Sequence, residues 1–435
     1  MSSHTSEQTD HPSASDPADD GIPAALPLTE PRDGVPLVID TQAGLERAAA
    51  ALAAGTGPAG VDAERASGFR YGQRAFLVQI RREGAGTWLI DPEPFEDLRI
   101  IDDALDGVEW ILHAASQDLP CLSELGMWPD RLFDTELAAR LAGLPRVGLA
   151  AVIESLLGLS LAKEHSAADW SKRPLPEPWL RYAALDVEVL TELRDKLAAL
   201  LEEDGKLKIA EEEFEHIRRT PPAEPRVDPW RRTSGLHQLR DRRQLAAVRQ
   251  MWLEREDLAQ RRDVAPGRLI PDSAIIAAAR AMPTTVPQLL ATKGFHGRAA
   301  QKEAPRWIRC ISEAGKLTDL PPLHVASNAP PPPRVWAEKD PEAAARLQTA
   351  RPRVTQRAEK LGMPVENLLT PDYLRRIAWR PPAEISLESV SAALADLGAR
   401  PWQIEQVAAI ITVAFLDPDP LPAKGAQGGP DTAPR

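Results

Sequence analysis

Alternating apolar and polar positions dominate the first part of the chain and predict β-strands. The segments "GPAGVDAERA", "RAFLVQI" and "GTWLID" follow one another across glycine-containing turns, after a short strand at 36–40 and a helix at 41–55. A fourth run, "VEWILHA" at 108–114, comes after an intervening helix. Consecutive strands followed by helices indicate a mixed sheet flanked by helices.

Helical spacing then continues from residue 115 to about 217, apart from a proline-containing loop at 163–178. Two proline-rich stretches separate further helical regions and mark domain boundaries. The predicted organisation is a disordered acidic tail (1–33), an α/β domain (34–217), a linker (218–229), a helical domain (230–316), a stiff proline-rich linker (317–336), a second helical domain (337–417) and a disordered tail (418–435).

Charge is distributed unevenly along the chain. The 52 Lys and Arg and 64 Asp and Glu give a net charge of −12, which alone argues against a nucleic-acid partner. Residues 226–316, however, hold 18 basic and 9 acidic residues, so this region is locally positive. Such asymmetry is typical of a module that binds polyanions, although a solvated arginine-rich helix face would give the same pattern.

The sequence also limits the location of the protein. The N-terminal residues lack the basic and apolar regions of a signal peptide, and no apolar run reaches the length of a membrane span. Cys121 and Cys310 lie far apart in apolar helical contexts and suggest neither a metal site nor a disulfide framework. We therefore expect a soluble, cytoplasmic protein without a membrane partner.

Four carboxylates and a tyrosine are the candidate chemistry. Asp62 and Glu64 are two apart on a predicted strand and share one face, unless this is simply an edge strand facing water. Asp118, in "HAASQD", follows the strand at 108–114, near a sheet end where α/β sites assemble. Tyr182 and Asp186 are four apart on a predicted helix and point the same way. Taken alone, that last pair could be a surface aspartate beside a half-buried tyrosine.

Carboxylate ligands without a His or Cys cluster favour Mg²⁺ or Mn²⁺ over zinc. Four acids can hold two such ions, an arrangement that stabilises the attacking and leaving oxygens of a phosphodiester. The residues therefore point to phosphodiester hydrolysis.

The ordered motifs resemble the DEDD superfamily of 3′–5′ exonucleases, in its tyrosine-bearing branch, and within it the ribonuclease D family. The resemblance rests on Asp-x-Glu, "HAASQD", "DWSKRPL" and "YAALDV", and covers about 36–210. It implies a ribonuclease-H-like mixed sheet and a metal-dependent 3′–5′ exoribonuclease. The fold class expected is thus α/β plus all-α, with two small helical domains of HRDC type after the exonuclease domain.

The resemblance also implies roles for individual residues. Asp62, Glu64, Asp118 and Asp186 would be ligands of two divalent ions, Mg²⁺ or Mn²⁺, and Tyr182 would orient or help deprotonate the attacking water. Since an unperturbed tyrosine titrates near pH ~10, orientation is the more economical role. The family often has Thr where this chain has Ala63, but that side chain should face away from the acids.

Weaker candidates lie near these motifs. His113, Gln79 and Trp170 could contribute to the site, but a histidine at a strand end is more often structural. Lys172 and Arg173 could bind substrate phosphate from the loop at 163–178, or could simply be solvated there.

The helical regions complete the expectation. Residues 228–316 resemble the HRDC domain, a small nucleic-acid-binding module, and their positive charge suits contacts with phosphates. The region at 357–379 resembles a divergent second domain of the same type, or is a packing domain. The expected substrates are RNA 3′ ends, such as tRNA precursors or other structured RNA. The alternatives are a DNA 3′–5′ exonuclease and an inactive nucleic-acid-binding scaffold.

Overall fold

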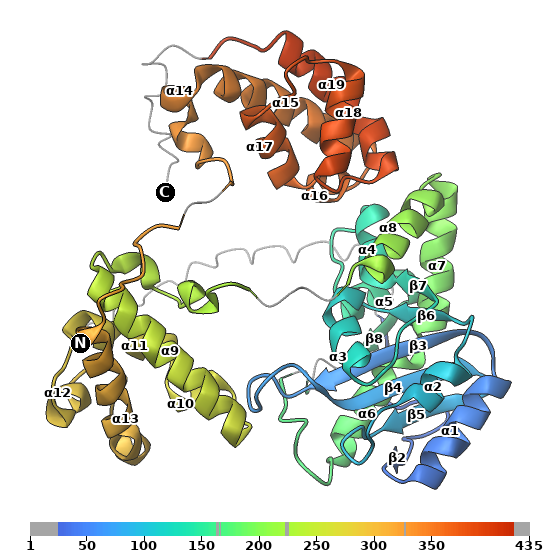
Figure 1. The fold of residues 1–435 in the computed structure, drawn as a ribbon. Helices are drawn as coiled ribbons and strands as arrows, with labels where there is room; N and C mark the ends of the chain where they lie inside the picture. The colour runs from blue at the N-terminus through green and yellow to red at the C-terminus, as the bar shows by residue number, and fades with distance from the viewer. Residues whose placement is uncertain (1–24, 162–164, 166, 222–225, 326–327, 422–435) are drawn as a thin grey trace, which may run out of the picture.

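A six-stranded mixed sheet forms the centre of the first domain (Figure 1). The structure, a computed structural model, describes residues 25–161, 165, 167–221, 226–325 and 328–421. The strand order is β2-β5-β4-β3-β6-β7, with β3 antiparallel to β4, β4 antiparallel to β5, and the other neighbours parallel. The strands are β2 (Val38–Ile39), β3 (Thr56–Arg65), β4 (Ala75–Glu83), β5 (Gly86–Ile90), β6 (Glu109–Leu112) and β7 (Arg131–Asp134).

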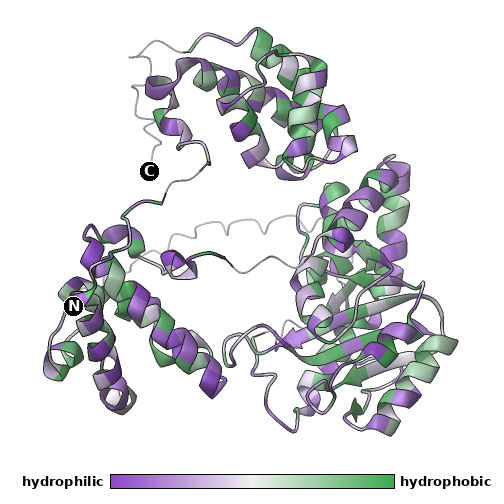
Figure 2. Cartoon of the chain, in the orientation of Figure 1, coloured by the Kyte–Doolittle hydropathy of each residue, from purple (hydrophilic) through white to green (hydrophobic). Residues whose placement is uncertain are grey.

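The alternation along β3 separates an apolar face of the sheet from a face that carries acids. Val61 and Ala63 belong to the main core, together with side chains of α1 (Gln42–Ala54) and α2 (Arg99–Ala104). Asp62 and Glu64 point to the other face, where α6 (Glu177–Glu188) packs against β3, β4 and β5. Figure 2 shows the strands as largely hydrophobic, as a sheet covered on both faces requires.

Gly60 allows α6 and α7 (Leu190–Glu203) to approach β3 closely. A Cβ atom at Gly60 would lie 3.2 Å from the side chain of Leu190 and 3.3 Å from the carbonyl oxygen of Val187. These contacts are tighter than ordinary packing, so a side chain here would push the helices outward. The glycine thus sets the distance between β3 and the helix that carries Asp186.

The remaining elements complete three domains. The first domain also contains η1 (Ala115–Gln117), α3 (Leu119–Glu124), α4 (Thr135–Leu141), α5 (Leu149–Leu157) and α8 (Leu207–Arg219). The first helical domain consists of η2 (Pro229–Arg232), η3 (Leu236–Gln238), α9 (Arg242–Arg262), α10 (Pro266–Leu269), α11 (Asp272–Ala281), α12 (Val286–Leu290) and α13 (Gly297–Lys316). The second consists of η4 (Pro333–Val335), α14 (Trp336–Lys339), α15 (Pro341–Lys360), α16 (Val365–Leu368), α17 (Pro371–Trp379), α18 (Leu387–Asp396) and α19 (Pro401–Leu416).

Three short strands correct the sequence-based expectations. The region after residue 115 is not wholly helical, because β7 extends the sheet and β8 (Leu159–Leu161) follows α5. The predicted disordered tail at 1–33 is wrong for its last part, since β1 (Leu26–Leu28) pairs in parallel with β8. Pairing with distant strands, and not a local alternating pattern, decides the structure of β1, β7 and β8. Residues 1–24 of that tail, and 422–435 of the C-terminal one, lie outside the described residues.

The first helical domain docks on the loop that follows β3. Asp263, at the end of α9, accepts hydrogen bonds from both terminal nitrogens of Arg74, at 3.0 and 2.9 Å. The backbone N–H of Ala265 donates to the carbonyl of Phe69 at 3.0 Å, and the Arg268 guanidinium lies 4.2 Å from the centre of the Phe69 ring. This domain therefore contacts the chain only a few residues beyond Glu64.

The second helical domain docks on α8 and on the loop before it. Glu213 of α8 accepts hydrogen bonds from Arg400 and from the indole nitrogen of Trp402, each at 2.8 Å. The ammonium group of Lys206 donates to the carbonyls of Leu141 and Gly362 at 3.0 and 3.4 Å. Apolar side chains of the two domains form one continuous buried cluster.

The expected fold class, α/β followed by all-α, is confirmed by these elements. Within the described part of the chain, none of the helices has the length and apolar character needed to cross a bilayer.

Candidate active site

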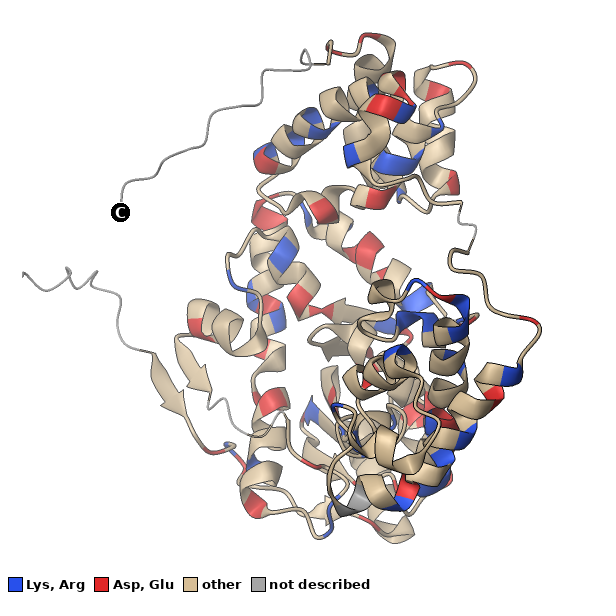
Figure 3. Cartoon of the chain, turned by 90° about the vertical axis from the view of Figure 1, so that its left-hand side faces the viewer, with Lys and Arg blue, Asp and Glu red and all other residues tan. Residues whose placement is uncertain are grey.

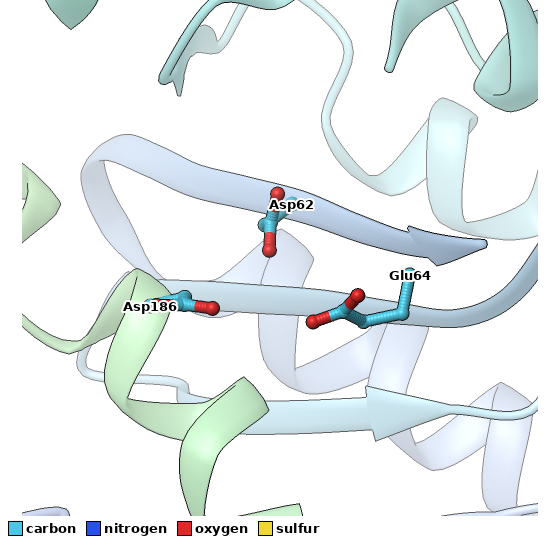
Figure 4. A group of neighbouring side chains, drawn as sticks. All are labelled: Asp62, Glu64 and Asp186. Carbon is cyan, nitrogen blue, oxygen red and sulfur yellow. The ribbon is translucent and has the colours of Figure 1, made fainter. Parts of the chain in front are cut away.

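Three of the predicted acids meet between β3 and α6. Asp62 and Glu64 project from β3 and Asp186 projects from α6 toward them (Figure 4). One carboxylate oxygen of each lies within 4.8 Å of the other two. Glu64 and Asp186 each expose only 9% of their surface, so these acids are held together away from bulk water.

Asp118 and Tyr182 line the same cavity as these three acids. The cavity has a volume of about 670 Å³ and is closed on another side by the beginning of α5. Asp118 lies between η1 and α3, beyond the end of β6, and is 5% exposed. Its carboxylate is turned to Arg65, whose terminal nitrogen is 3.2 Å from Asp118 Oδ1. The structure thus gathers all five predicted residues in one cavity, with Asp118 beside the cluster of three.

Burial raises the pKa values of all four acids, and neighbouring carboxylates raise those of Glu64, Asp118 and Asp186 further. Burial raises the pKa of Asp62 to about 6, against the pull of the Ala63 backbone N–H and of Arg65. Burial and the charge of Asp62 raise the pKa of Asp118 to about 8. The pKa values of Glu64 and Asp186 are held well above the ordinary range by burial first and by neighbouring carboxylates second. All four carboxylates can be ionised together at neutral pH only when positive charge is added beside them.

Tyr182 keeps its proton at neutral pH. Burial raises the pKa of its phenol above the ordinary value, and the charges of Asp186 and Glu64 add to the effect. The hydroxyl interacts with the Asp186 carboxylate one helical turn away, which is the i and i+4 geometry expected from the sequence. A protonated phenol can donate a hydrogen bond and orient a neighbouring oxygen, but it cannot act as a base.

Arg65 is a member of the site that the sequence did not reveal. Alternation along a strand predicts that it faces away from Asp62 and Glu64. The register of β3 against β4 shifts between Glu64 and Arg65, and this irregularity coincides with the turn of Arg65 toward Asp118. Its guanidinium also donates to the carbonyl of Gln117. It is the only Lys or Arg among the residues that line the described cavity.

Asp134 holds the turn that presents Asp118. The carboxylate of this buried residue, at the end of β7, accepts the backbone N–H groups of Ala114 and Ala115 at 3.1 and 2.9 Å. It also caps α4 by accepting the N–H groups of Glu136 and Leu137. Ala114 has a φ of 62°, a left-handed conformation that costs energy in a residue with a side chain. The Asp134 hydrogen bonds offset that cost, and the chain then enters η1 and reaches Asp118.

Among the weaker candidates, Gln79 contacts an acid of the site, whereas His113 and Trp170 make contacts within the fold. Its side-chain nitrogen, fully buried on β4 opposite Asp62, lies 3.5 Å from Asp62 Oδ2. His113 lines the cavity, but its Nδ1 is 2.9 Å from the Thr135 hydroxyl and burial lowers its pKa to about 4. Trp170 is fully buried in an apolar cluster that also contacts Tyr182.

The two basic residues of the loop at 163–178 differ in their surroundings. Arg173 donates to both carboxylate oxygens of Asp91 and to the carbonyls of Trp170 and Phe76, so its guanidinium is already occupied within the protein. Lys172 is exposed, with its ammonium group 6.0 Å from the centre of the Trp179 ring. Only Lys172 remains a candidate for contact with phosphate.

Three segments of the chain match known protein families. Residues 36–202 match the family described as "3′-5′ exonuclease", residues 244–311 match "HRDC domain", and residues 329–415 match "3′ to 5′ exonuclease C-terminal domain". The third match has its own description, so the likeness of the second helical domain to HRDC stays a prediction.

Individual proteins and solved structures resemble the chain over most of its length. Ribonuclease D of Pseudomonas paraeruginosa is 30% identical over 307 residues, which cover 70% of this chain and 79% of that protein. Ribonuclease D of Escherichia coli is 33% identical over 51% of this chain and 62% of that protein. A crystal structure of a protein from Bifidobacterium adolescentis has a TM-score of 0.84 and 41% identity, covering 90% of this chain and all of that one. The structure of Escherichia coli RNase D, "an exoribonuclease involved in structured RNA processing", has a TM-score of 0.62 and 26% identity, over 83% of this chain and 98% of that one.

Proposed function

This chain belongs to the ribonuclease D family of 3′–5′ exoribonucleases, and we propose that it removes nucleotides from RNA 3′ ends at the cavity between β3 and α6. The observation that carries the assignment is the convergence of Asp62, Glu64 and Asp186 to within 4.8 Å in that cavity. Asp118 and Tyr182 would complete the site from two further elements. The roles of these five residues are part of the proposal.

The donors fit divalent cations. The family implies divalent metals, and the cavity offers hard carboxylate oxygens whose pKa values are raised, chiefly by burial. Asp62, Glu64 and Asp186 would hold one ion, and Asp118 with Asp62 would contribute to a second. We propose Mg²⁺ or Mn²⁺, which oxygen donors favour over zinc. When bound, two such ions would stabilise the charge on the attacking and leaving oxygens of the scissile phosphodiester.

The protein's own groups would position the reactants. Tyr182, protonated and beside Asp186, would donate a hydrogen bond to the attacking water and fix its direction. Gln79 holds Asp62 from the neighbouring strand. Arg65 would transfer from Asp118 to a phosphate oxygen of the RNA as cations take the carboxylate. Such positioning supplies much of the rate advantage when several groups are fixed on rigid strands and helices.

The substrate we propose is the 3′ end of stable RNA, including tRNA precursors, in the cytoplasm. The relatives named ribonuclease D, including the Escherichia coli exoribonuclease involved in structured RNA processing, support RNA as the substrate class. Preference over DNA requires the site to sense the 2′-hydroxyl. The test below therefore compares RNA with DNA, and faster cleavage of DNA would favour the alternative of a DNA exonuclease.

The test is digestion of 3′-labelled RNA and DNA of the same sequence with Mg²⁺, Mn²⁺ or EDTA. We expect mononucleotides from RNA with either metal and none with EDTA. Faster release from DNA would overturn the RNA assignment. Asp186→Asn should lose cleavage while remaining folded, because removing one acid relieves repulsion in the metal-free cluster. If it cleaved as fast as the parent, the proposed site would be wrong. If the parent bound RNA without cleaving it under any of these conditions, the scaffold alternative would hold.

A further inference from the structure

The arginines of the long helix α9 are mostly occupied inside the first helical domain. Arg255 donates to Asp272 at 2.7 Å, Arg262 to Glu303 at 2.7 Å, and Arg261 to Asp257. Arg242 and Arg243, at the start of the helix, donate instead to backbone carbonyls between residues 314 and 321. The positive charge predicted to bind phosphates along this helix is therefore largely neutralised or used in packing.

Two arginines of the domain that have no carboxylate partner among the described residues, Arg232 and Arg240, line a cavity elsewhere in the domain. A cavity of about 570 Å³ is lined by basic side chains, namely Arg231, Arg232, Arg240, His237 and His324. None of its lining residues is Asp or Glu. The described part of the chain offers no carboxylate within 4.0 Å of Arg232 or Arg240, and one terminal nitrogen of Arg240 donates to the carbonyl of His237 at 2.6 Å. Figure 3, which views the molecule from the side of this domain, shows Lys and Arg distributed over its elements.

Two segments build this cavity and are tied together by hydrogen bonds. The segment 231–240 precedes α9, and residues 323–324 follow α13. A terminal nitrogen of Arg231 donates to the carbonyl of Pro322 at 3.2 Å, and Arg242 donates to the carbonyl of Pro321 at 3.2 Å. The Arg231 guanidinium also lies 4.4 Å from the centre of the buried Trp230 ring. These contacts hold the cavity open where both linkers enter the domain.

The nearby acids that the structure describes neutralise Arg231 but leave Arg232 and Arg240 unpaired. Asp228 accepts from the indole nitrogen of Trp230 at 3.0 Å and from Arg231 at 3.3 Å. Asp272 accepts from Arg255 and from the backbone N–H of Ser234. A second concavity of about 580 Å³ shares Arg231 and Arg232 with the first and adds Arg226. Arg231 and Arg232 therefore line both concavities.

We propose that this cavity, rather than the exposed face of α9, is a second RNA site that binds the phosphodiester backbone upstream of the 3′ end. Arg232 and Arg240 contact phosphate oxygens, and Leu239 and Leu245, 4% and 3% exposed, give the cavity an apolar wall for a base or ribose. Such contacts give affinity without sequence specificity. The proposal rests on the proposed function, since it assigns this cavity to the same RNA.

The test compares two full-length double variants that remove the same charge. Arg232→Gln with Arg240→Gln alters the cavity. Arg261→Gln with Arg309→Gln alters two exposed arginines of the same domain that are paired with acids, 58% and 57% exposed. Binding to a long and to a short single-stranded RNA is measured by fluorescence anisotropy in an Asp186→Asn background over a range of salt. Cleavage of the short RNA is measured in the active background.

We expect the cavity variant to lose about tenfold or more in affinity for long RNA. The slope of log affinity against log salt should become shallower by about 1.4, which is two contacts at ~0.7 each. The paired-arginine control should change less than twofold, and cleavage of the short RNA should persist in both. Arg232→Lys with Arg240→Lys should retain most of the affinity, which also shows that the domain tolerates substitution.

Two results would overturn the proposal. Equal losses in the cavity and control variants would mean that diffuse charge, and not the cavity, binds RNA. Unchanged affinity for long RNA in the cavity variant would mean that the cavity does not bind RNA. Failure of the parent protein to cleave the short RNA would contradict the proposed function. That result is distinct from the two that concern the cavity.

Discussion

Asp62 and Asp118 share a cavity with Glu64 and Asp186, and their raised pKa values give the metal-free protein a defined response to pH. With folded-state pKa values of about 6 and 8, these groups keep protons that the unfolded chain loses near pH ~4. The stability they contribute is full below the unfolded pKa and is lost as pH rises through the folded values.

We therefore predict that the unfolding temperature in EDTA falls by about 5 °C between pH 5.5 and 8. Differential scanning fluorimetry checks this, with the same series in Mg²⁺ as the control. Mg²⁺ should flatten the dependence, because bound cations compensate the ionised carboxylates. A metal-free protein that becomes more stable toward pH 8 would contradict the clustering of the acids.

Tyr182 offers a prediction that separates orientation from metal binding. Tyr182→Phe keeps the ring and its packing but removes the hydroxyl that interacts with Asp186. We expect the single-turnover rate to fall by roughly 10²-fold, the scale of a positioned catalytic group. Calorimetric titration with Mn²⁺ should show nearly unchanged affinity. A comparable loss of metal binding would mean that the hydroxyl holds the ligands and does not orient the water.

Arg65 competes with cations for Asp118 in the metal-free site. Arg65→Gln removes a guanidinium 3.2 Å from the Asp118 carboxylate, so Mn²⁺ should bind about three- to tenfold more tightly in calorimetric titrations without RNA. The unfolding temperature in EDTA should fall, because the acids lose their neighbouring positive charge. Arg99→Gln, at an exposed arginine paired with Asp97, is the matched control and should change neither. Weaker Mn²⁺ binding in Arg65→Gln would show that Arg65 organises Asp118 for the metal.

At the scale of elements, Asp134 at the end of β7 fixes the conformation of the turn that follows β6. Asp134→Ala removes the acceptor for four backbone N–H groups, two in the turn before η1 and two at the start of α4. We predict a loss of about 3 kcal/mol in the free energy of unfolding and at least a tenfold loss in cleavage, because the turn leads to Asp118. Urea unfolding and initial rates measure the two effects.

A cap far from the site provides the control for this prediction. Thr41 caps α1 by accepting the N–H of Gly44, and Thr41→Ala should cost about 1 kcal/mol without changing the rate of the folded protein. If Asp134→Ala lowered stability but left the rate unchanged, Asp134 would only cap α4.

The sequence predicted the elements that carry a clear local pattern. Alternation located β3 to β6, and Thr41 with Gly55 located α1. The strands β1, β7 and β8 were not predicted, because pairing with distant strands decides their structure. The same limit applies to the site. The four acids and Tyr182 followed from motif order, whereas the Arg65 contact depends on a register irregularity. The role of Asp134 depends on hydrogen bonds that its carboxylate accepts from the backbone after β6.

At the scale of the whole molecule, Glu213 links the first domain to the second helical domain. Arg400 and Trp402 donate to its carboxylate, and both partners are largely buried. We predict that Glu213→Ala lowers the free energy of unfolding by about 3 kcal/mol, because it leaves a buried guanidinium unpaired. Small-angle scattering should show a larger radius of gyration as the domain detaches.

The cleavage of a short RNA should be nearly unchanged in this variant, since Glu213 does not line the active-site cavity. Glu215→Ala, on the exposed side of the same helix, is the matched control and should leave the scattering curve unchanged. An unaltered radius for Glu213→Ala would mean that apolar contacts alone hold the two domains together.

The Glu213 contacts also bear on how the protein is made. Arg400 and Trp402 lie 187 and 189 positions beyond Glu213, so the ribosome releases the acid long before its partners exist. At ~5–20 residues per second, the interval is about 10–40 s, far longer than a domain of this size needs to collapse. The nascent exonuclease domain must therefore persist with the docking surface around Glu213 and Lys206 open to water. The charged groups of Glu213 and Lys206 keep part of that surface hydrated, whereas a wholly apolar surface would favour association between neighbouring nascent chains.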